Sequence, residues 1–272
     1  MNTKKIAWLT DIHLNFLDLE ARKLFYQRIS DANTDSLLIT GDIGEARDIC
    51  KLLTELSTNI DKPIYFVLGN HDYYFGSVIS VREAILALCA QNSKLYWLGK
   101  PEIIELNNHT ILVGHDGWAD GRYGDFDHSP VNLNDSRYIS EQYQARLLNK
   151  SELLKEMQYL ADADSVILKQ TLVNAIKPTH KKVIIATHVP PFPECCWHQG
   201  MPTDDDWLPY FSSKATGDVI LDVTKNYPDL DFLVLCGHTH TDKTIQLLKN
   251  LEIKVGKAQY YQPEIQDIIE VS

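Results

Sequence analysis

Six short apolar segments constrain the fold of this chain more than any other feature of its sequence. An unbroken apolar run is typical of a strand that is buried on both faces, whereas a strand with one solvent face alternates. The six therefore predict β-strands with helices on both faces of a sheet. They are KIAWLT, DSLLIT, PIYFVLG, TILVG, KVIIAT and DFLVLC, at residues 5–10, 35–40, 63–69, 110–114, 182–187 and 231–236.

Helical patterns separate the first three of these segments. Within residues 19–32, LEARKLFYQRISDA, apolar residues recur at steps of three and four, as on one face of a helix, at Leu24, Phe25, Ile29 and Ala32. A second helix is expected at about residues 45–58. Strands and helices that alternate in this order indicate a parallel sheet with right-handed crossovers.

The pattern changes after residue 231. Three segments, TIQLLKN, LEIKVGKAQ and EIQDIIEV, follow one another with short connections. We expect them to form short antiparallel strands that close a second sheet. The chain is expected to be a single domain, residues 1–272, with a helical cap inserted at about residues 116–160 and a long loop at residues 190–216.

Charge and cysteine content exclude several classes of protein. The net charge is −11 at pH 7, so nonspecific binding to nucleic acid or to an anionic membrane is not expected. The five cysteines have no CxxC spacing, which is typical of reduced thiols in a cytoplasmic protein. The sequence contains no run of 18 apolar residues, so no transmembrane helix is expected. Asp11 ends the first apolar run too early for a signal peptide.

Polar residues follow five of the predicted strands, in the segments TDIH, TGDIGE, LGNHDYY, ATHVPP and CGHTHTD. In an open α/β sheet the ligand site lies at the carboxyl ends of the strands. One edge should therefore gather eight oxygen or imidazole groups, a set without sulfur that suits manganese, iron or zinc. Eight groups exceed the needs of one ion, and two ions that share a carboxylate would use them. The eight are Asp11, His13, Asp42, Asn70, His71, His188, His238 and His240.

These segments resemble the calcineurin-like metallophosphoesterases. That family has the ordered blocks DxH, GDx, GNH[DE], an isolated histidine and GHxH. The corresponding residues here are DIH at 11–13, GDI at 41–43, GNHD at 69–72, His188, and GHTH at 237–240. The resemblance spans nearly the whole chain. It implies a four-layer αββα sandwich of two mixed sheets and a metal-dependent phosphoesterase that takes a small phosphorylated substrate.

The resemblance also assigns metal ligands. The first ion would be held by Asp11, His13, Asp42 and His240, and the second by Asp42, Asn70, His188 and His238. Asp42 would bridge the two divalent ions, for which manganese is the first choice and iron or zinc the alternatives. The implied reaction is in-line attack on phosphorus by a hydroxide shared between the ions.

A catalytic role is implied for His71, which is not a ligand in the family pattern. It would donate a proton to the leaving oxygen. An acidic neighbour would keep His71 protonated, and Glu45 and Asp72 are both candidates.

Substrate specificity is expected from the two inserted segments, because loops on a rigid sheet are where such proteins vary their chemistry. Arg122 is the candidate for binding a phosphate or carboxylate group of the substrate. Trp118 and Trp197 are candidates for stacking on a planar group.

Departures from the branches of the family narrow the predicted function. Protein Ser/Thr phosphatases and diadenosine tetraphosphatases carry GDxxDRG, whereas this chain has GDIGEARD, which speaks against protein phosphatase activity. Its charge and length disfavour the DNA-repair exonucleases. The predicted function is hydrolysis of a phosphomonoester or phosphodiester of a small molecule. A cyclic-nucleotide phosphodiesterase is one alternative, and a non-catalytic metal-binding scaffold for protein interaction is another.

Overall fold

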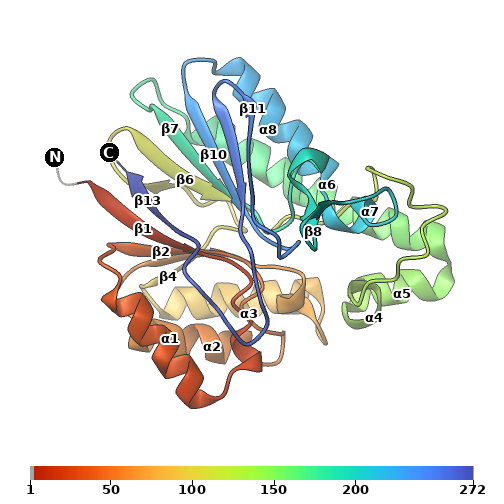
Figure 1. Ribbon diagram of the computed structural model, residues 1–272, viewed down its shortest axis with the longest axis horizontal. Helices are drawn as coiled ribbons and strands as arrows, with labels where there is room; N and C mark the ends of the chain where they lie inside the picture. The colour runs from red at the N-terminus through yellow and green to blue at the C-terminus, as the bar shows by residue number, and fades with distance from the viewer. Residues whose placement is uncertain (1–2, 272) are drawn as a thin grey trace.

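In the computed structural model, which describes residues 3–271, two large β-sheets lie face to face between outer layers of helices (Figure 1). The first sheet has the strand order β13-β1-β2-β3-β4. Strands β1, β2 and β3 are parallel, as predicted. Strand β4, which was not predicted, is parallel to β3, and β13 is antiparallel to β1. The strands are β1 at Lys4–Leu9, β2 at Ser36–Thr40, β3 at Ile64–Val67, β4 at Leu95–Trp97 and β13 at Asp267–Val271.

The second sheet has the order β11-β12-β10-β7-β6-β5. Its central strands are parallel, and the two edge strands β5 and β11 are antiparallel to their neighbours. Both sheets are therefore mixed. The strands are β5 at Ile104–Glu105, β6 at Thr110–Gly114, β7 at Lys182–Ala186, β10 at Asp231–Cys236, β11 at Lys243–Leu248 and β12 at Leu251–Val255.

The C-terminal strands differ in part from the prediction. Strands β11 and β12 form the expected antiparallel pair, but β12 is parallel to β10. The last strand, β13, was expected in the second sheet and instead pairs with β1 in the first. The chain between β12 and β13, residues 256–266, therefore crosses from one sheet to the other.

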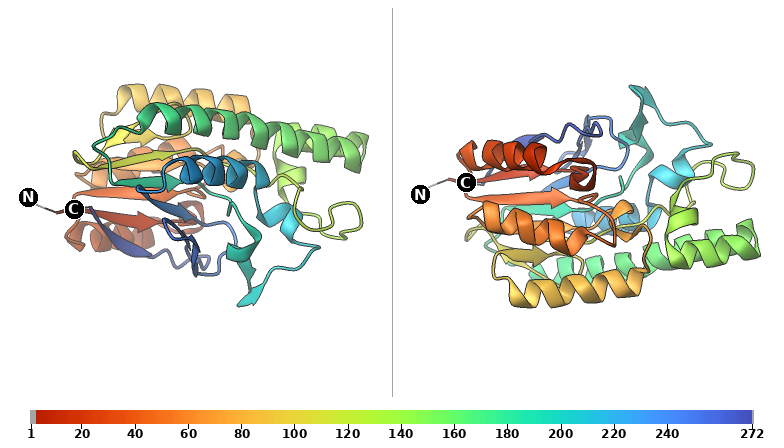
Figure 2. Two further views of the ribbon diagram at one scale, coloured as in Figure 1. Left: turned by 90° about the horizontal axis from the view of Figure 1, so that it is seen from above. Right: turned by 90° about the horizontal axis from the view of Figure 1, so that it is seen from below.

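Three helices cover the first sheet and two cover the second. Helices α1 at Leu19–Asp31, α2 at Ile49–Asn59 and α3 at Val78–Gln91 lie on the first sheet, and α6 at Lys150–Ala175 and α8 at Lys214–Asn226 lie on the second (Figure 2). Helix α2 begins four residues later than predicted. The prediction that Leu24 faces the core is wrong, because its side chain is exposed and Tyr26 is buried in α1 instead.

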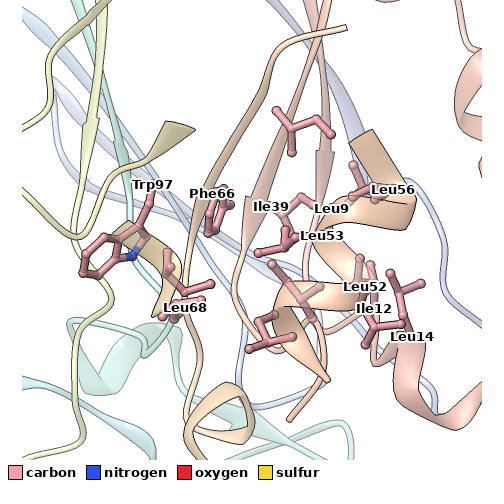
Figure 3. Packing of buried hydrophobic residues seen from close by; sticks show 14 of the residues in the cluster. Leu9, Ile12, Leu14, Ile39, Leu52, Leu53, Leu56, Phe66, Leu68 and Trp97 are labelled. Carbon is pink, nitrogen blue, oxygen red and sulfur yellow. The ribbon is translucent and has the colours of Figure 1, made fainter. Parts of the chain in front are cut away.

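Side chains that alternate along each strand fill three separate hydrophobic layers. Leu9, Ile39 and Phe66 point outward from the first sheet and pack against α2 and its neighbours (Figure 3). The residues one step away along the same strands, such as Trp8 and Leu38, point the other way and pack against the second sheet. The outer face of the second sheet packs against α6 and α8. These layers hold the carboxyl ends of both sheets at one edge.

The segment predicted to be a cap, residues 116–160, contains α4 at Asp135–Tyr138, α5 at Ser140–Leu148 and the first part of α6 (Figure 2). We call these residues the cap. Helix α6 continues unbroken past residue 160 to Ala175. The long loop, residues 190–216, contains the short strands β8 at Trp197–His198 and β9 at Met201–Pro202, and the short helix α7 at Leu208–Phe211.

All five cysteines lie in the described part of the chain and are free. Within the same residues, no helix combines the length and the hydrophobicity that crossing a membrane requires.

Candidate metal centre

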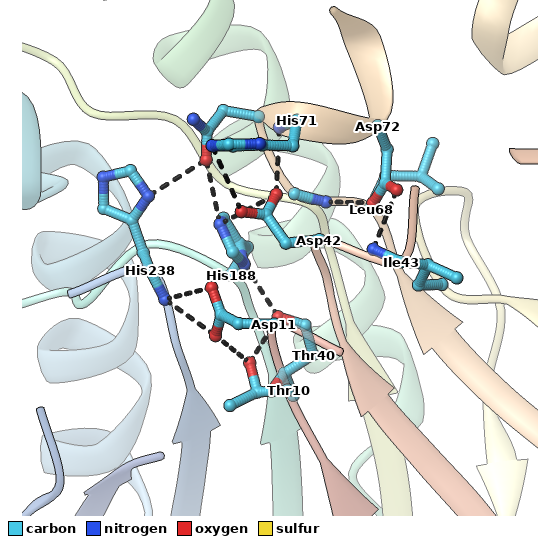
Figure 4. Close-up of polar contacts among 12 residues, drawn as sticks. Thr10, Asp11, Thr40, Asp42, Ile43, Leu68, His71, Asp72, His188 and His238 are labelled. Atoms are coloured by element: carbon cyan, nitrogen blue, oxygen red, sulfur yellow. Dashed lines mark hydrogen bonds and ion pairs between the residues drawn. The ribbon is translucent and has the colours of Figure 1, made fainter. Parts of the chain in front are cut away.

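The predicted ligands come together where the carboxyl ends of the two sheets meet. Figure 4 labels four of them, Asp11, Asp42, His188 and His238. Asp11 and His13 follow β1, Asp42 follows β2, and Asn70 follows β3, all in the first sheet. From the second sheet, His188 follows β7, and His238 and His240 follow β10. Each strand ends in a tight turn, so its polar side chains are presented at the edge of the fold.

Five of these residues have left-handed backbone conformations, which cost non-glycine residues about 1–2 kcal/mol each. Hydrogen bonds between the turns maintain the strained backbone: the N–H of Asp11 donates to Gly41 O at 3.0 Å, and that of His13 donates to Asp42 O at 2.9 Å. Strain of this kind is found at functional sites. The φ angles are 48° at Asp11, 39° at His13, 54° at Asp42, 71° at His238 and 56° at His240.

Two glycines allow the turns to approach one another. A Cβ atom at Gly237 would collide with the carboxylate of Asp11, and one at Gly69 would collide with the carboxylate of Asp42. Any side chain at either position would therefore displace a candidate ligand.

The first ligand group contains Asp11, His13, Asp42 and His240. One ligand atom from each lies within 4.8 Å of every other. His13 is buried, and neither of its ring nitrogens has a hydrogen-bond partner among the described residues. A buried polar group without a partner destabilises the fold. A cation coordinated by one of the two His13 nitrogens would supply the missing interaction.

The second ligand group includes His188 and His238. In each of these rings, one nitrogen makes a hydrogen bond to a backbone carbonyl oxygen. His188 Nδ1 is 2.8 Å from Thr40 O, and His238 Nε2 is 2.9 Å from Tyr210 O. A carbonyl oxygen only accepts, so each of these nitrogens carries the proton. The other nitrogen of each ring then presents a lone pair.

Those two lone pairs converge on an oxygen. His188 Nε2 and His238 Nδ1 are each 3.0 Å from Asn70 Oδ1, and His188 Nε2 is 3.4 Å from Asp42 Oδ1. These three distances link four acceptor atoms that have no proton between them in the neutral state. A divalent cation fits this arrangement, because it turns repulsion among lone pairs into coordination.

The Asp42 carboxylate lies between the two groups. Its Oδ2 is 3.7 Å from His13 Nε2 in the first group, and its Oδ1 faces His188 in the second. The structure thus places all seven residues predicted as ligands at one edge of the fold, and their division between two ions stays a prediction.

The pKa shifts of the histidines agree with this fit. Burial and the charge of His71 hold the pKa of His13 well below its ordinary value. Burial lowers the pKa of His188, and burial with the charge of His188 lowers that of His238 to about 4. These imidazoles are therefore neutral at pH 7, as coordination requires.

The pKa values of the two buried carboxyl groups, Asp42 and Asp11, shift in opposite directions. Burial and the charge of Asp11 raise the pKa of Asp42 well above its ordinary value. Burial would raise the pKa of Asp11 as well, but its hydrogen bond to His240 and the charges of the histidines lower it. Two neighbouring carboxylates resist simultaneous ionisation, and bound cations would remove that resistance.

His71 lies beside the ligand groups and belongs to neither. Its Nε2 is 3.9 Å from Asp42 Oδ2, and its ring stacks on Tyr74 at a centroid distance of 4.2 Å. Burial lowers the pKa of His71 to about 4, although the charge of Asp135 acts to raise it. The side chain keeps 17% of its surface exposed, so a substrate can reach the ring.

The two predicted acidic partners of His71 lie elsewhere. The carboxylate of Asp72 accepts hydrogen bonds from the backbone N–H groups of Ile43, Gly44 and Gly69 (Figure 4). It therefore fixes two of the site loops to each other, which corrects its predicted role at His71. Glu45 pairs with Arg47 at 2.6 Å, and no hydrogen bond joins it to His71 among the described residues.

The residues predicted to bind substrate have other contacts. The guanidinium of Arg122 binds Asp120 at 3.0 Å and Asp162 at 2.8 Å, which indicates a role in fixing the cap. Trp118 is buried, with its ring centroid 4.9 Å from that of Tyr73. The ring of Trp197 is covered by the Lys243 ammonium, 3.8 Å from its centroid.

Three residues that the sequence analysis did not single out border the site. Asp135 and Tyr74 hydrogen-bond to Asn70, at 2.8 and 3.3 Å. Tyr260, in the crossing segment, has its ring 4.7 Å from that of His13 and 5.2 Å from that of His240, and is 41% exposed. Tyr74 ends the segment LGNHDYY, whereas Asp135 and Tyr260 stand in no recognisable motif, so no sequence signal could have identified those two.

The sandwich of two mixed sheets and the Asp/His centre at their common edge define a metal-dependent phosphoesterase. A family model described as calcineurin-like phosphoesterase matches residues 4–242. The chain belongs to the calcineurin-like phosphoesterase family, and it is an enzyme that hydrolyses phosphate esters with divalent metal ions.

Solved structures share the fold. The chain is similar to the phosphopantetheinyl hydrolase of Mycobacterium tuberculosis, with a TM-score of 0.70 and 12% identity over 99% of this chain and 96% of that one. It is also similar to a dimetal phosphatase of Danio rerio, with a TM-score of 0.53 and 14% identity over 96% and 89% of the two chains. None of the curated proteins matches the sequence.

Proposed function

We propose that the centre holds two divalent ions on either side of Asp42, and that the enzyme uses it to hydrolyse a phosphomonoester or phosphodiester of a small molecule. The observation that carries this proposal is the convergence of unprotonated ligand atoms on both sides of one carboxylate. Asp11, His13 and His240 would complete the first site, and Asn70, His188 and His238 the second.

The donor set favours manganese, with iron or zinc as alternatives, because it consists of imidazole nitrogens and carboxylate or amide oxygens without thiolate. When bound, such ions lower the pKa of water and neutralise the charge of the phosphoryl group. The net charge of −11 is consistent with a substrate anion that is received by cations in the site and not by a basic surface.

His71 is the proposed proton donor to the leaving oxygen; because burial lowers its pKa to about 4, we infer that the negative charge of a bound phosphate raises this pKa and so supplies the protonated form. It borders the Asp42 carboxylate without joining either ligand group, and its ring is accessible. Stacking on Tyr74 and the edge contact with His13, at 4.8 Å between centroids, hold the imidazole in one orientation. A positioned acid of this kind contributes about 10²–10⁴ in rate.

The cap, residues 116–160, is proposed to enclose one side of the centre and to limit which leaving groups fit. One of its contacts with the site runs through Asp135 and Asn70. The opposite side is bordered by the exposed ring of Tyr260. We infer that the leaving group lies between these two sides.

The test is a panel of phosphomonoesters and phosphodiesters, assayed with chelator-treated enzyme and with added manganese, iron or zinc. The panel should include 4-nitrophenyl phosphate, bis(4-nitrophenyl) phosphate, a cyclic nucleotide and, because of the name of the Mycobacterium tuberculosis neighbour, a phosphopantetheine ester. We expect no turnover without metal, and turnover with two ions bound per chain. Inactivity with every metal would favour the scaffold, and full activity with one ion would contradict the dinuclear centre.

A further inference from the structure

Asp135 of the cap contacts the centre through a single ligand residue. Its carboxylate oxygen Oδ1 accepts a hydrogen bond from Asn70 Nδ2 at 2.8 Å, although 65 residues separate the two in the chain. We propose that Asp135 is a positioning residue that turns the Asn70 amide toward the second metal ion, so that this ion binds tightly only when the cap is seated. The inference rests on the dinuclear centre proposed above.

The chemistry of the amide explains why an acidic residue is needed. An asparagine side chain can place either its oxygen or its nitrogen toward a neighbouring group. A carboxylate accepts hydrogen bonds and does not donate them, so Asp135 selects the nitrogen end. The Asn70 oxygen must then face His188 Nε2 and His238 Nδ1, each 3.0 Å away, where a metal ligand is required.

Tyr74 closes the arrangement. Its hydroxyl donates to Asp135 Oδ1 at 2.6 Å and accepts from Asn70 Nδ2 at 3.3 Å. The three side chains therefore form a triangle in which every donor has an acceptor. Because Asp135 is nearly fully buried, water cannot easily replace its carboxylate if that group is removed.

Backbone contacts that follow Asp135 in the chain attach this part of the cap to the loop after Asn70. Phe75 N donates to Tyr138 O at 2.8 Å, and Ser140 N donates to Gly76 O at 3.0 Å. The position of the carboxylate is thus set by how residues 135–140 lie against residues 70–76. This geometry links the seating of the cap to the orientation of a metal ligand.

The experiment is a calorimetric titration of metal-free enzyme with Mn²⁺, together with the electron paramagnetic resonance signal of the bound ions, which distinguishes isolated from coupled pairs. The variants are Asp135→Asn and the control Asp127→Asn. Asp127 is an exposed cap residue whose substitution changes the net charge equally. We expect Asp135→Asn to bind the first ion as wild type does and the second about 10- to 100-fold more weakly, with loss of the coupled signal. The control should match wild type at both sites.

Each other outcome has a distinct meaning. Unchanged affinity for both ions in Asp135→Asn, with two ions bound by wild type, would overturn this inference and leave the proposed function intact. Equal weakening at both sites would also overturn it, because the effect would not be specific to Asn70. Wild-type enzyme that binds fewer than two ions would contradict the dinuclear centre itself. If Asp135→Asn does not fold, Tyr74→Phe removes two sides of the triangle, the hydrogen bonds of the Tyr74 hydroxyl with Asp135 and with Asn70, and unchanged second-ion affinity there would overturn the inference.

Discussion

Arg82, which is partly buried, and Asp164, which is buried, form an ion pair that joins the two halves of the molecule. Arg82 belongs to α3, on the first sheet, and Asp164 to α6, on the second, and Arg82 Nη2 lies 3.0 and 2.8 Å from the two carboxylate oxygens. The same nitrogen also donates to Asp116 at 3.0 Å. Asp116 accepts from the backbone N–H of Leu68 at 2.8 Å, immediately before the loop that contains Asn70 and His71.

Removing one partner of this pair should destabilise the fold. We expect Asp164→Asn to lower the free energy of unfolding by about 2 kcal/mol, because Arg82 keeps Asp116 as a partner but loses a charged hydrogen-bond acceptor in a partly buried position. Urea denaturation measures the change. The control is Asp222→Asn, which breaks the exposed pair between Asp222 and Lys169 of the same helix α6 and should cost less than about 1 kcal/mol. Equal effects in the two variants would contradict the prediction.

The same residue predicts a pH dependence of stability. Burial would raise the pKa of Asp164, but the charges of His115 and Arg82 and their hydrogen bonds lower it from 3.8 to about 2. A carboxyl with a depressed folded-state pKa contributes stability that is complete above pH 3.8 and is lost as the pH falls through about 2. The stability advantage of wild type over Asp164→Asn should therefore shrink by about 2 kcal/mol between pH 5 and pH 2. An advantage that stays constant over this range, measured by denaturation at each pH, would show that the pKa is not depressed.

Asp42→Asn tests the shared carboxylate. Because Asp42 has one oxygen toward each ligand group, loss of its charge should weaken both sites and lower kcat by at least about 100-fold. Elemental analysis of the purified variant should show less than full occupancy. Two tightly bound ions in the variant would rule out a bridging role.

His71→Ala separates proton donation from metal binding. We expect two bound ions, a loss of about 10²–10⁴ in kcat with an alkyl phosphate, and a much smaller loss with 4-nitrophenyl phosphate, whose leaving group needs no proton. Loss of metal, or an equal loss of rate on both substrates, would mean that His71 is a ligand or a binding residue.

Tyr260 and Arg122 should behave differently on substitution. Tyr260 has an exposed ring beside His13, so Tyr260→Ala is expected to raise KM by about tenfold with metal content unchanged.

Arg122 is held by Asp120 and Asp162, so Arg122→Ala is expected to lower thermal stability and to leave the ranking of substrates unaltered. Steady-state kinetics across the panel would reveal the reverse pattern if the earlier assignment of Arg122 to substrate binding is right.

The ligand residues could be predicted from the sequence because each one follows a strand whose position in a sheet is set by its own apolar residues. Asp11 and His188 are 177 residues apart, yet both sit at strand ends, so local patterns suffice to bring them to one edge. Asp135 could not be predicted in this way, since its contact with Asn70 depends on how the cap folds back. The sheet that β13 joins could not be predicted either. Residues 267–271 have the pattern of a strand, but nothing in them specifies β1 as the neighbour.

Helix α6 limits how the enzyme can admit its substrate. Leu153 and Met157 of this helix pack in the cap, while Leu168 and Leu172 pack against the second sheet. Its 26 residues contain neither proline nor glycine, the usual causes of a kink. A hinge at this end of the cap would have to break the helix, so opening motions are expected to pivot instead on the preceding loop, where Gly117, Gly121 and Gly124 have positive φ angles. The route by which a leaving group departs should accordingly run past α4 and α5, away from the fixed axis of α6.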